Sequence, residues 1–438
     1  MKKIVVLGGG ISGVGAALLA KKNGYDVFLS DKGIILDKKT LTNNNIKFEE
    51  GIHTIKEVMT ASEVVKSPVI SDSEDLIKQI KDKGISVISE IEFASRFTNS
   101  KIIAITGTNG KTTTTLLLGH ILEKEGYDVL VAGNIGTGFA KSIAERDYDY
   151  IILEVSSFQL DGIKDFKPDI AILLNITPDH LDRYQNSFEN YIESKLQITK
   201  NQDKNDVFIY NYDDINIRDT IKTKAKMIPF SLKKIFKTDG AFYDNNEINI
   251  NLNNNQMTIQ DLALQGKHNV YNSMAAAVAS RVLEVRDFIT RQSLQDFRNI
   301  AHRLEHVINV HGIEFINDSK ATNINSVWFA LESMHKEIVW IAGGVDKGNN
   351  YEELIELVKE KVKSIVCIGQ KTENIHNSFK DHVDNIVDAN SMNEAVGFSY
   401  QLAEKGDVVL LSPACASFDM FKNFEHRGEE FKKCVRSL

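Results

Sequence analysis

The sequence predicts an α/β protein of three domains, each built on a mostly parallel sheet with crossover helices. Short apolar runs alternate with glycine-rich or polar loops and amphipathic segments, which is the pattern of parallel sheets. The pattern restarts twice along the 438 residues, a length that suits domains of roughly 150 residues. We therefore expect domains over residues 1–93, 94–300 and 301–438.

The first segment opens with a strand, a glycine-rich turn and a helix. The strand covers Lys3–Leu7, the turn covers Gly8–Gly13, and a second strand, Asp26–Ser30, ends at Asp31. This spacing of glycines and acid matches the dinucleotide-binding fingerprint of Rossmann domains. Taken alone it favours NAD or FAD, but the turn and the helix N-terminus suit any diphosphate, a nucleotide-sugar included. We expect a Rossmann-like domain here.

The central segment starts with a similar unit. Its strand covers Lys101–Ile105, and its helix runs from about Thr112 to Glu125. Strands at Asp149–Val155 and Asp169–Ile176 are nearly unbroken runs of Ile, Leu and Val, as in strands that are covered on both faces. From residue 230 to residue 265, short Asn-rich alternating segments predict surface hairpins without a functional role.

The third segment repeats the alternation and predicts a second Rossmann-like domain. Strands and helices follow one another at the spacing of βαβ units. The expected strands are Glu314–Asn317, Ile338–Ala342, Ser364–Ile368 and Asp407–Leu411, and the expected helices are Ile324–His335, Tyr351–Val362 and Met392–Glu404.

Composition excludes several classes of function. The chain has 52 Lys and Arg against 60 Asp and Glu, a net charge of −8, and no long basic run, so we expect no nucleic-acid partner. No apolar stretch reaches the roughly 18 to 20 residues that span a bilayer. The three cysteines form no CxxC pair and no even disulfide set. A cytoplasmic protein without membrane insertion is expected.

A phosphate-binding loop follows the first central strand. Gly107-Thr108-Asn109-Gly110-Lys111-Thr112 lies between that strand and a helix, the context in which such a loop binds phosphates. Its backbone N–H groups face a polyphosphate, Lys111 neutralises phosphate charge, and the Thr112 hydroxyl ligates Mg²⁺. The loop departs from the common spacing because Ile105 stands where a glycine is usual. Nucleotide binding follows, but P-loops serve many reactions.

Polar clusters follow two neighbouring strands. Glu154 ends one buried strand, and Asn175 to Tyr184 follow the next. Burying an acid costs free energy unless a cation lies beside it. For Glu154 that cation is either the Mg²⁺ at the phosphate loop or a lysine side chain. The carboxyl ends of parallel strands lie at one edge of the sheet, where open α/β sheets bind ligands.

These residues belong to a series that resembles the Mur ligases along most of the chain. The similar segments are Gly107–Thr112, Glu154–Gln159, Asp179–Asp182, Lys267–Asn269, His302–Glu305 and Asn317–Asn323. Two more, Gly133–Gly136 and Leu411–Gly428, resemble the members of the family that use D-glutamate.

The resemblance implies an ATP- and Mg²⁺-dependent amide-forming ligase of peptidoglycan precursor synthesis. Its expected substrates are ATP, UDP-N-acetylmuramoyl-L-alanine and D-glutamate. ATP phosphorylates the alanine carboxylate in such a reaction, and the glutamate amine then displaces phosphate from the acyl phosphate. Closure of the domains before chemistry is expected because a hydrolysable intermediate needs a site without water. A monomer is expected.

The resemblance also implies roles for individual residues. Lys111, His180 and Lys195 are the expected catalytic residues, with Lys195 carbamylated. ATP is expected at Gly107, Thr108, Asn109, Gly110, Lys111, Thr112, Thr113, Asn269, Asn272, Arg303, Asp318 and Lys320, with His268 near adenine. The nucleotide-sugar is expected at Ser12, Asp31, Lys32, Asn134 and His180, D-glutamate at Thr322, Lys347, Ser417 and Phe424, and Mg²⁺ at Thr112, Glu154, His180 and Lys195.

One segment departs from the family. Ser67-Pro68-Val69 stands where Mur ligases usually have Ser-Pro-Gly. A valine cannot take the conformations or the close approach that glycine allows, so we expect a changed contact of this loop with the nucleotide-sugar.

Three other functions compete with this interpretation. A folylpolyglutamate synthase shares the phosphate loop but does not explain the first glycine turn or the segment Ser417–Phe424. An NAD-dependent oxidoreductase leaves Lys111, Glu154 and Arg303 without a role. A non-catalytic nucleotide-binding scaffold does not need the full set of charged residues.

Overall fold

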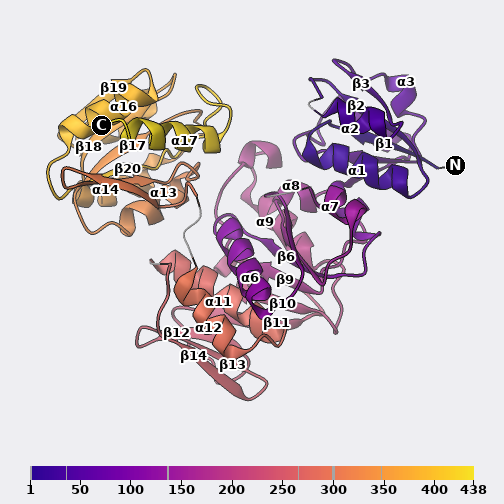
Figure 1. Cartoon of the computed structure of the whole chain (residues 1–438), viewed down its shortest axis with the longest axis horizontal. Helices are drawn as coiled ribbons and strands as arrows, with labels where there is room; N and C mark the ends of the chain where they lie inside the picture. The colour runs from indigo at the N-terminus through magenta and orange to yellow at the C-terminus, as the bar shows by residue number, and fades with distance from the viewer. Residues whose placement is uncertain (1, 36, 136–137, 265, 298–300, 347) are drawn as a thin grey trace. The chain divides into compact units, whose positions relative to one another are not determined.

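The computed structural model of the chain describes residues 2–35, 37–135, 138–264, 266–297, 301–346 and 348–438. Its strands form three sheets, and each sheet lies within one of the three expected segments (Figure 1). The chain divides into two compact units: Met1–Ala263 with Asn269–Phe297, and Leu264–His268 with Arg298–Leu438. The α/β class is confirmed, and the first two sheets share one compact unit.

The first sheet is entirely parallel, with strand order β3-β2-β1-β4-β5. Its glycine turn is tight. Gly8 has a φ of +104°, and a Cβ on Gly13 would lie 1.9 Å from the Gly8 carbonyl oxygen. The elements are β1 (Lys3–Leu7), α1 (Ile11–Lys22), β2 (Asp26–Asp31), α2 (Lys38–Asn43), β3 (Lys47–Glu50), α3 (Ile55–Val58), β4 (Glu63–Lys66), α4 (Asp75–Asp82), β5 (Ser86–Ser89) and α5 (Glu90–Ser95).

The central sheet has nine strands in the order β14-β13-β12-β11-β10-β9-β6-β8-β7. Pairing is parallel from β7 to β12, and β12, β13 and β14 pair antiparallel. The first strands and helices are β6 (Lys101–Thr106), α6 (Lys111–Glu125), β7 (Val129–Gly133), α7 (Phe139–Glu145), β8 (Tyr150–Glu154), α8 (Ser157–Leu160), β9 (Ile170–Leu173), η1 (Leu181–Tyr184), α9 (Phe188–Leu196) and η2 (Gln197–Thr199). The later ones are β10 (Val207–Asn211), α10 (Ile215–Arg218), β11 (Lys226–Ser231), β12 (Gly240–Asp244), β13 (Glu247–Leu252), β14 (Asn255–Ile259), α11 (Lys267–Val282) and α12 (Asp287–Asp296).

The Asn-rich segment forms the expected hairpins, but their place differs from the expectation. Strands β12, β13 and β14 continue the central sheet, and alternate residues of β13, among them Ile248 and Ile250, are fully buried. The asparagines occupy the intervening positions and the turns, where Asn253 and Asn254 adopt positive φ. One face of the hairpins therefore belongs to the core and not to the surface.

The third sheet has the order β15-β16-β20-β17-β18-β19, with β15 as the antiparallel edge. Strand β20 lies between β16 and β17, so the loops after these three strands are neighbours at the carboxyl edge. The elements are β15 (Glu305–Val310), β16 (Ile313–Asn317), α13 (Ile324–Glu332), β17 (Ile338–Ala342), η3 (Tyr351–Leu354), α14 (Ile355–Lys361), β18 (Val362–Ile368), α15 (Glu373–Phe379), β19 (Asn385–Ala389), α16 (Met392–Leu402), β20 (Val408–Leu411) and α17 (Phe424–Val435).

Two buried glutamates of α5 fasten the first sheet to the central one. Glu92 accepts hydrogen bonds from the backbone N–H groups of residues 164, 165 and 166, and from Arg96. Burial acts to raise the pKa of Glu92, but these donors outweigh it and lower the pKa. Glu90 accepts a hydrogen bond from the Ala140 N–H, and burial raises the pKa of Glu90 to about 7. Two carboxyl groups on one helix are thus shifted in opposite directions.

Replacing each glutamate by glutamine should change stability with opposite sign. Ionisation of Glu90 costs folded stability between about pH 4.5 and about pH 7, so Glu90→Gln should leave stability at pH 4 nearly unchanged and raise it at pH 8, by up to about 3 kcal/mol. Glu92→Gln should lower stability by about 2 kcal/mol at pH 7, because it removes a charged acceptor from three N–H groups. Chemical denaturation of the first compact unit at several pH values measures both. A pH dependence of Glu90→Gln that parallels the parent protein would contradict the assignment.

Candidate active site

The phosphate loop lies at the carboxyl end of β6 and requires both of its glycines. Gly107 and Gly110 have φ of +152° and +84°. A Cβ on Gly110 would lie 2.2 Å from Asn272 Oδ1 of α11. Asn175, after β9, fastens the loop, because its carbonyl and side-chain oxygens accept the N–H groups of Thr108 and Asn109 at 2.9 and 2.8 Å. The loop is therefore held in shape by polar groups of the neighbouring strand.

Two lysines converge on one carbonyl oxygen of this loop. Lys111, the first residue of α6, donates from Nζ to the carbonyl oxygens of Gly107 and Thr108 at 2.9 and 2.8 Å. Lys195, on α9, donates from Nζ to Gly107 O at 2.9 Å and lies 4.8 Å from the centre of the Tyr191 ring. Burial, and next the positive charge of Lys111, lower the pKa of Lys195 far below its usual range. The lowered pKa favours the neutral form of the Lys195 amine.

Glu154 completes a cluster of oxygen ligands beside the loop. It is 2% exposed at the end of β8, and strand register places it next to Ile105 of β6. Its carboxylate accepts hydrogen bonds from Thr112 Oγ1 at 2.6 Å and from Asn134 Nδ2 at 3.1 Å. Carboxylate and hydroxyl oxygens are the ligands that Mg²⁺ prefers, so Thr112 and Glu154 fit the cation that a triphosphate brings.

His180 lies in the segment after β9 with a backbone φ of +54°. Its ring contacts the Phe158 ring edge-on at 5.2 Å between centroids, and Nε2 is 3.7 Å from Asp179 Oδ2. The Arg183 guanidinium lies 4.5 Å from the same Phe158 ring. Residues that follow β6, β8 and β9 thus reach the same edge of the central sheet, as the sequence predicted.

In the first sheet, Asp31 is engaged by its own glycine turn. Its carboxylate accepts the backbone N–H groups of Gly9 and Gly33. Lys32 pairs with Glu74 at 2.8 Å, and Ser12 lies in the first turn of α1. The sequence motif did not indicate that Asp31 stabilises the turn itself, and its contact with a nucleotide-sugar stays a prediction, as do those of Ser12 and Lys32.

Helix α1 packs against helix α7, which follows β7 of the central sheet. Gly15 allows this close packing, because a Cβ there would lie 2.8 Å from the backbone nitrogen of Lys141 on α7. A Cβ on Gly138, at the start of α7, would lie 3.1 Å from the Ile11 side chain. The glycine turn therefore lies close to the loop that follows β7, of which residues 136 and 137 fall outside the described ranges.

Arg183, in the segment that follows β9 of the central sheet, holds the Ser67-Pro68-Val69 segment. The Arg183 guanidinium donates to the carbonyl oxygens of Pro68 and Val69, both at 3.2 Å. The Val69 side chain is 80% exposed, and Gly8 packs directly against Ser67. The exposed valine side chain therefore does not crowd its neighbours. The hydrogen bonds from Arg183 hold the backbone of the loop in place.

In the second compact unit, Asp318 is a buried carboxyl group at the end of β16. It accepts hydrogen bonds from Ser412 Oγ at 2.9 Å and from the Leu304 N–H at 3.3 Å, and Arg303 Nη1 lies 3.6 Å away. Burial raises the pKa of Asp318 to about 6 against the opposing charge of Arg303. His268 of the same unit is half-buried, and desolvation with the charge of Arg303 lowers its pKa to about 3. Asp318 and Arg303 lie together.

Arg427, on α17, is a residue to which the sequence analysis gave no role. Its guanidinium is 1% exposed and donates to Ser319 Oγ at 3.0 Å, Ser319 O at 2.8 Å and Cys415 O at 3.1 Å. It therefore joins the loop after β16 to the loop after β20. The sequence signal that could have found Arg427 is a basic residue inside the segment of small and polar residues that ends at Gly428.

The remaining expected residues of this unit lie near these loops. Ser319 Oγ donates to the Phe424 carbonyl at 2.8 Å, and Lys320 Nζ lies 5.4 Å from the Phe424 ring centre. Ser417 is buried, and Thr322 is half-buried before α13. Lys347 lies outside the described residues.

The expected residues fall into two groups. The first compact unit holds Ser12, Asp31, Lys32, Gly107, Thr108, Asn109, Gly110, Lys111, Thr112, Thr113, Asn134, Glu154, His180, Lys195, Asn269 and Asn272, and the second holds Arg303, Asp318, Lys320, Thr322, Ser417 and Phe424. Within the first, hydrogen bonds join Gly107 with Lys111 and Lys195, and Glu154 with Thr112 and Asn134. The roles of these residues stay predictions.

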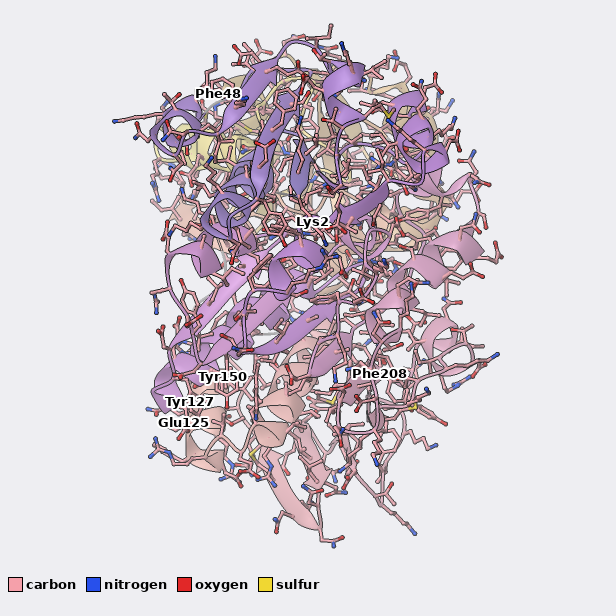
Figure 2. All side chains as sticks on the ribbon, turned by 90° about the vertical axis from the view of Figure 1, so that its right-hand side faces the viewer. Lys2, Phe48, Glu125, Tyr127, Tyr150 and Phe208 are labelled. Atoms are coloured by element: carbon pink, nitrogen blue, oxygen red, sulfur yellow. The ribbon has the colours of Figure 1, made fainter. Side chains whose placement is uncertain are left out.

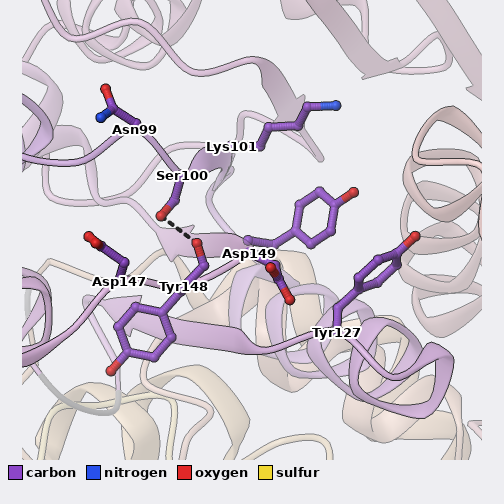
Figure 3. Close-up of a pocket in the computed structure, with 8 residues that line it drawn as sticks. Asn99, Ser100, Lys101, Tyr127, Asp147, Tyr148 and Asp149 are labelled. Carbon is purple, nitrogen blue, oxygen red and sulfur yellow. Dashed lines mark hydrogen bonds between the residues drawn. The ribbon is translucent and has the colours of Figure 1, made fainter.

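A separate pocket of about 440 Å³ opens at the other end of the central strands (Figure 3). It is lined by Asn99, Ser100, Lys101, Tyr127 and residues 147–150. Ser100 Oγ donates to Tyr148 O at 2.6 Å (Figure 3). Tyr127 and Tyr150, both labelled in Figure 2, have rings that meet edge-on with 4.8 Å between centroids. Because these residues precede β6, β7 and β8, the pocket is remote from the phosphate loop.

The strand, glycine loop, helix and buried acid define a nucleotide-binding protein of the P-loop class. A family model of the Mur ligase middle domain matches residues 105–280, and one of the Mur ligase glutamate ligase domain matches residues 302–415. The chain belongs to the Mur ligase family.

Similar proteins cover the whole chain. A protein of Christiangramia forsetii is 52% identical over 444 residues, 100% of both chains. A protein of Bacteroides fragilis is 48% identical over 100% of both chains, and one of Porphyromonas gingivalis is 47% identical over 99% of this chain and 98% of its own. All three bear the name UDP-N-acetylmuramoylalanine–D-glutamate ligase.

Solved structures share the fold. A pseudomurein peptide ligase type C of Methanothermus fervidus has a TM-score of 0.62 at 20% identity and covers 99% of this chain and 100% of its own. A MurF ligase of Thermotoga maritima, solved in complex with ADP, has a TM-score of 0.62 at 16% identity and covers 96% of this chain and 99% of its own. Among the described helices, none has the length and apolar character that crossing a membrane requires.

The lowered pKa of Lys195 predicts a reaction with carbon dioxide, which only a neutral amine undergoes. In the presence of ¹³C-bicarbonate at neutral pH, the protein should show a carbamate carbon resonance in its NMR spectrum. Lys195→Ala should lack the resonance, whereas Lys200→Ala, which removes an exposed lysine next to the same helix, should keep it. A resonance that survives in Lys195→Ala would contradict the assignment.

Proposed function

We propose that this chain is an ATP-dependent ligase that joins D-glutamate to UDP-N-acetylmuramoyl-L-alanine by an amide bond, in peptidoglycan precursor synthesis. The observation that carries the proposal is the name shared by relatives that are 47–52% identical over nearly the whole chain. The phosphate loop supplies the chemistry that this reaction needs. The oxidoreductase, folylpolyglutamate synthase and scaffold alternatives lack such support.

The central site would bind ATP and Mg²⁺. The N–H groups of the loop from Gly107 to Thr113 would hold the phosphates, with Lys111 as their counter-charge. Thr112 and Glu154 would ligate Mg²⁺, with Lys195, as its carbamate, and His180 completing a second cation site. The cation would neutralise charge on the phosphates. Asn269, Asn272, Arg303, Asp318 and Lys320 are proposed to contact the rest of ATP, with His268 near adenine.

The proposed reaction has two steps. An oxygen of the alanine carboxylate attacks the γ-phosphorus of ATP, and the bond from that phosphorus to ADP breaks. The D-glutamate amine then attacks the acyl carbon, the carbon–oxygen bond to phosphate breaks, and the amine loses a proton. Lys111 would stabilise charge on the transferred group, and the buried site would limit attack by water.

The two other substrates are assigned to the outer domains, 1–93 and 301–438. Ser12, Asp31 and Lys32 of the first domain would bind the nucleotide-sugar, with Asn134 and His180 of the central domain near its reacting end. Thr322, Lys347, Ser417 and Phe424 would bind D-glutamate. A diacid needs two anion-binding points, which a lysine with hydroxyl or backbone donors supplies. We further propose domain closure before chemistry, a monomer, and a cytoplasmic location.

One assay tests the proposed function directly. With ATP, Mg²⁺ and UDP-N-acetylmuramoyl-L-alanine present, D-glutamate should release phosphate, whereas L-glutamate should not. Phosphate should also require the nucleotide-sugar. Equal release with both enantiomers, or release without the nucleotide-sugar, would overturn the proposal.

Lys111→Ala should reduce turnover by at least about 10³-fold, because it removes the positive charge next to the transferred phosphoryl group. Binding of UDP-N-acetylmuramoyl-L-alanine, measured by calorimetry, should change less than about twofold. Lys124→Ala, on the same helix but paired with Asp296, is the matched control and should keep full turnover. Comparable loss of turnover and nucleotide-sugar binding in Lys111→Ala would contradict the separation of the two sites.

A further inference from the structure

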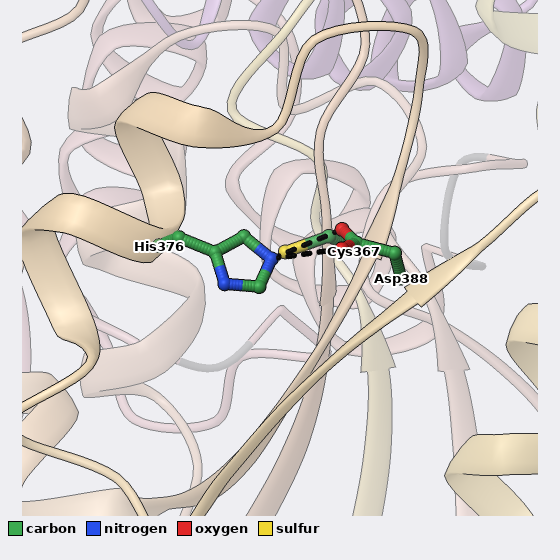
Figure 4. Close-up of side chains that lie close together, drawn as sticks. All are labelled: Cys367, His376 and Asp388. Atoms are coloured by element: carbon green, nitrogen blue, oxygen red, sulfur yellow. Dashed lines mark hydrogen bonds and ion pairs between the residues drawn. The ribbon is translucent and has the colours of Figure 1, made fainter.

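Three side chains with metal-binding atoms converge in the third sheet, within the second compact unit. Cys367 lies on β18, His376 on α15 and Asp388 on β19 (Figure 4). One ligand atom from each lies within 4.8 Å of the other two. Strand register places Cys367 directly beside Asp388, and His376 Nε2 is 3.0 and 3.1 Å from the two Asp388 oxygens. Three elements thus direct a sulfur, a nitrogen and an oxygen to one point.

We propose that Cys367, His376 and Asp388 bind a divalent transition metal of the zinc class. Sulfur, imidazole and carboxylate ligands together favour Zn²⁺ or Co²⁺ and disfavour Mg²⁺. In tetrahedral zinc sites, bonds of about 2.0–2.3 Å place the ligand atoms about 3.3–3.8 Å apart. The ligand atoms lie up to 4.8 Å apart, so binding needs a contraction of about 1 Å, which side-chain rotation of the partly exposed His376 and Asp388 can supply.

The charges of the site support a divalent cation. A thiolate and a carboxylate together balance two positive charges, and neutral imidazole adds none. Burial, and next the charge of Asp388, raise the pKa of the Cys367 thiol, so coordination must replace its proton, which leaves to solvent. Cys367 is fully buried, whereas His376 and Asp388 are partly exposed, 34% and 56% of their side chains. The open side leaves the fourth position to water.

The site adjoins a second pocket of the same sheet. Asn374, two residues before His376 on α15, donates from Nδ2 to Asp346 Oδ2 at 3.0 Å. Asp346 and Asn374 line a pocket of about 450 Å³ together with Gly344, Gln370 and Asp419. A metal on His376 would therefore fix the helix that forms one wall of this pocket. The metal site itself does not depend on the proposed ligase function.

Cobalt titration of the full chain, freed of metal with a chelator, tests the proposal. Stoichiometric Co²⁺ should produce the near-ultraviolet band of thiolate-to-cobalt charge transfer, together with the intense visible bands of a tetrahedral site. Co²⁺ at the phosphate loop has oxygen ligands and gives no thiolate band. Zn²⁺ should displace the cobalt, and millimolar Mg²⁺ should not. Absence of a thiolate band at saturating Co²⁺ would overturn the proposal.

Variants locate the band. Cys367→Ser should abolish it, and Asp388→Asn and His376→Gln should each raise the Co²⁺ dissociation constant at least about tenfold. Cys434→Ser and His382→Gln are matched controls on residues outside the cluster and should retain the parent spectrum. Because Asp388 is exposed, Asp388→Asn should fold even where Cys367→Ser does not, as circular dichroism will show. A band that survives in Cys367→Ser, or a dissociation constant unchanged in Asp388→Asn, would refute the site.

Discussion

The active edge of this protein depends on how two lysines and a carboxylate are accommodated at the ends of apolar strands. Strands β6, β8 and β9 are almost fully buried, so each polar group at their carboxyl ends needs a partner. The Gly107 carbonyl accepts both Lys111 and Lys195, and Glu154 accepts Thr112 and Asn134. Burial of the Lys195 amine, and next the positive charge of Lys111 beside it, lower the pKa of Lys195 far below its usual range.

The same principle organises the third sheet through one buried cation. Insertion of β20 between β16 and β17 brings three loops to one edge, but the topology alone does not fix their conformations. Arg427 does so by donating to Ser319 and Cys415, and burial lowers its pKa only to about 10, which leaves it protonated at neutral pH. The hydrogen bonds offset the cost of its desolvation. The loops that carry the expected glutamate-binding residues are therefore held together by Arg427, which is buried.

Local sequence predicted the elements whose signals are local. Strands β1 and β17 have the expected bounds, and α6 ends at Glu125, just before Gly126, where a φ of +105° favours glycine. Strands β15 and β19 received no prediction, because their polar and apolar residues mix without a clear period. Helix α17 also received none, although its buried residues follow a helical spacing.

In the site, strand ends predicted the grouping of Lys111, Thr112 and Glu154. The contacts of Arg427 and Glu92 could not be predicted. Ser319 lies 108 residues from Arg427, and Phe166 lies 74 residues from Glu92, so only the tertiary fold brings these partners together.

The glycine turn of the first sheet shows why one kind of motif specifies a ligand poorly. Gly13 is required because any Cβ would collide with the Gly8 carbonyl, whatever diphosphate the turn meets. Asp31, the acid that completes the fingerprint, binds the N–H groups of Gly9 and Gly33 and so also serves the backbone. Gly13 and Asp31 of the motif are therefore explained by the geometry of the backbone turn. Lys195 donates to one backbone carbonyl, that of Gly107, and the Glu154 carboxylate accepts from the side chains of Thr112 and Asn134; burying either charged group costs free energy. Such residues carry the stronger functional information, because their chemistry, and not the geometry of a turn, accounts for their presence.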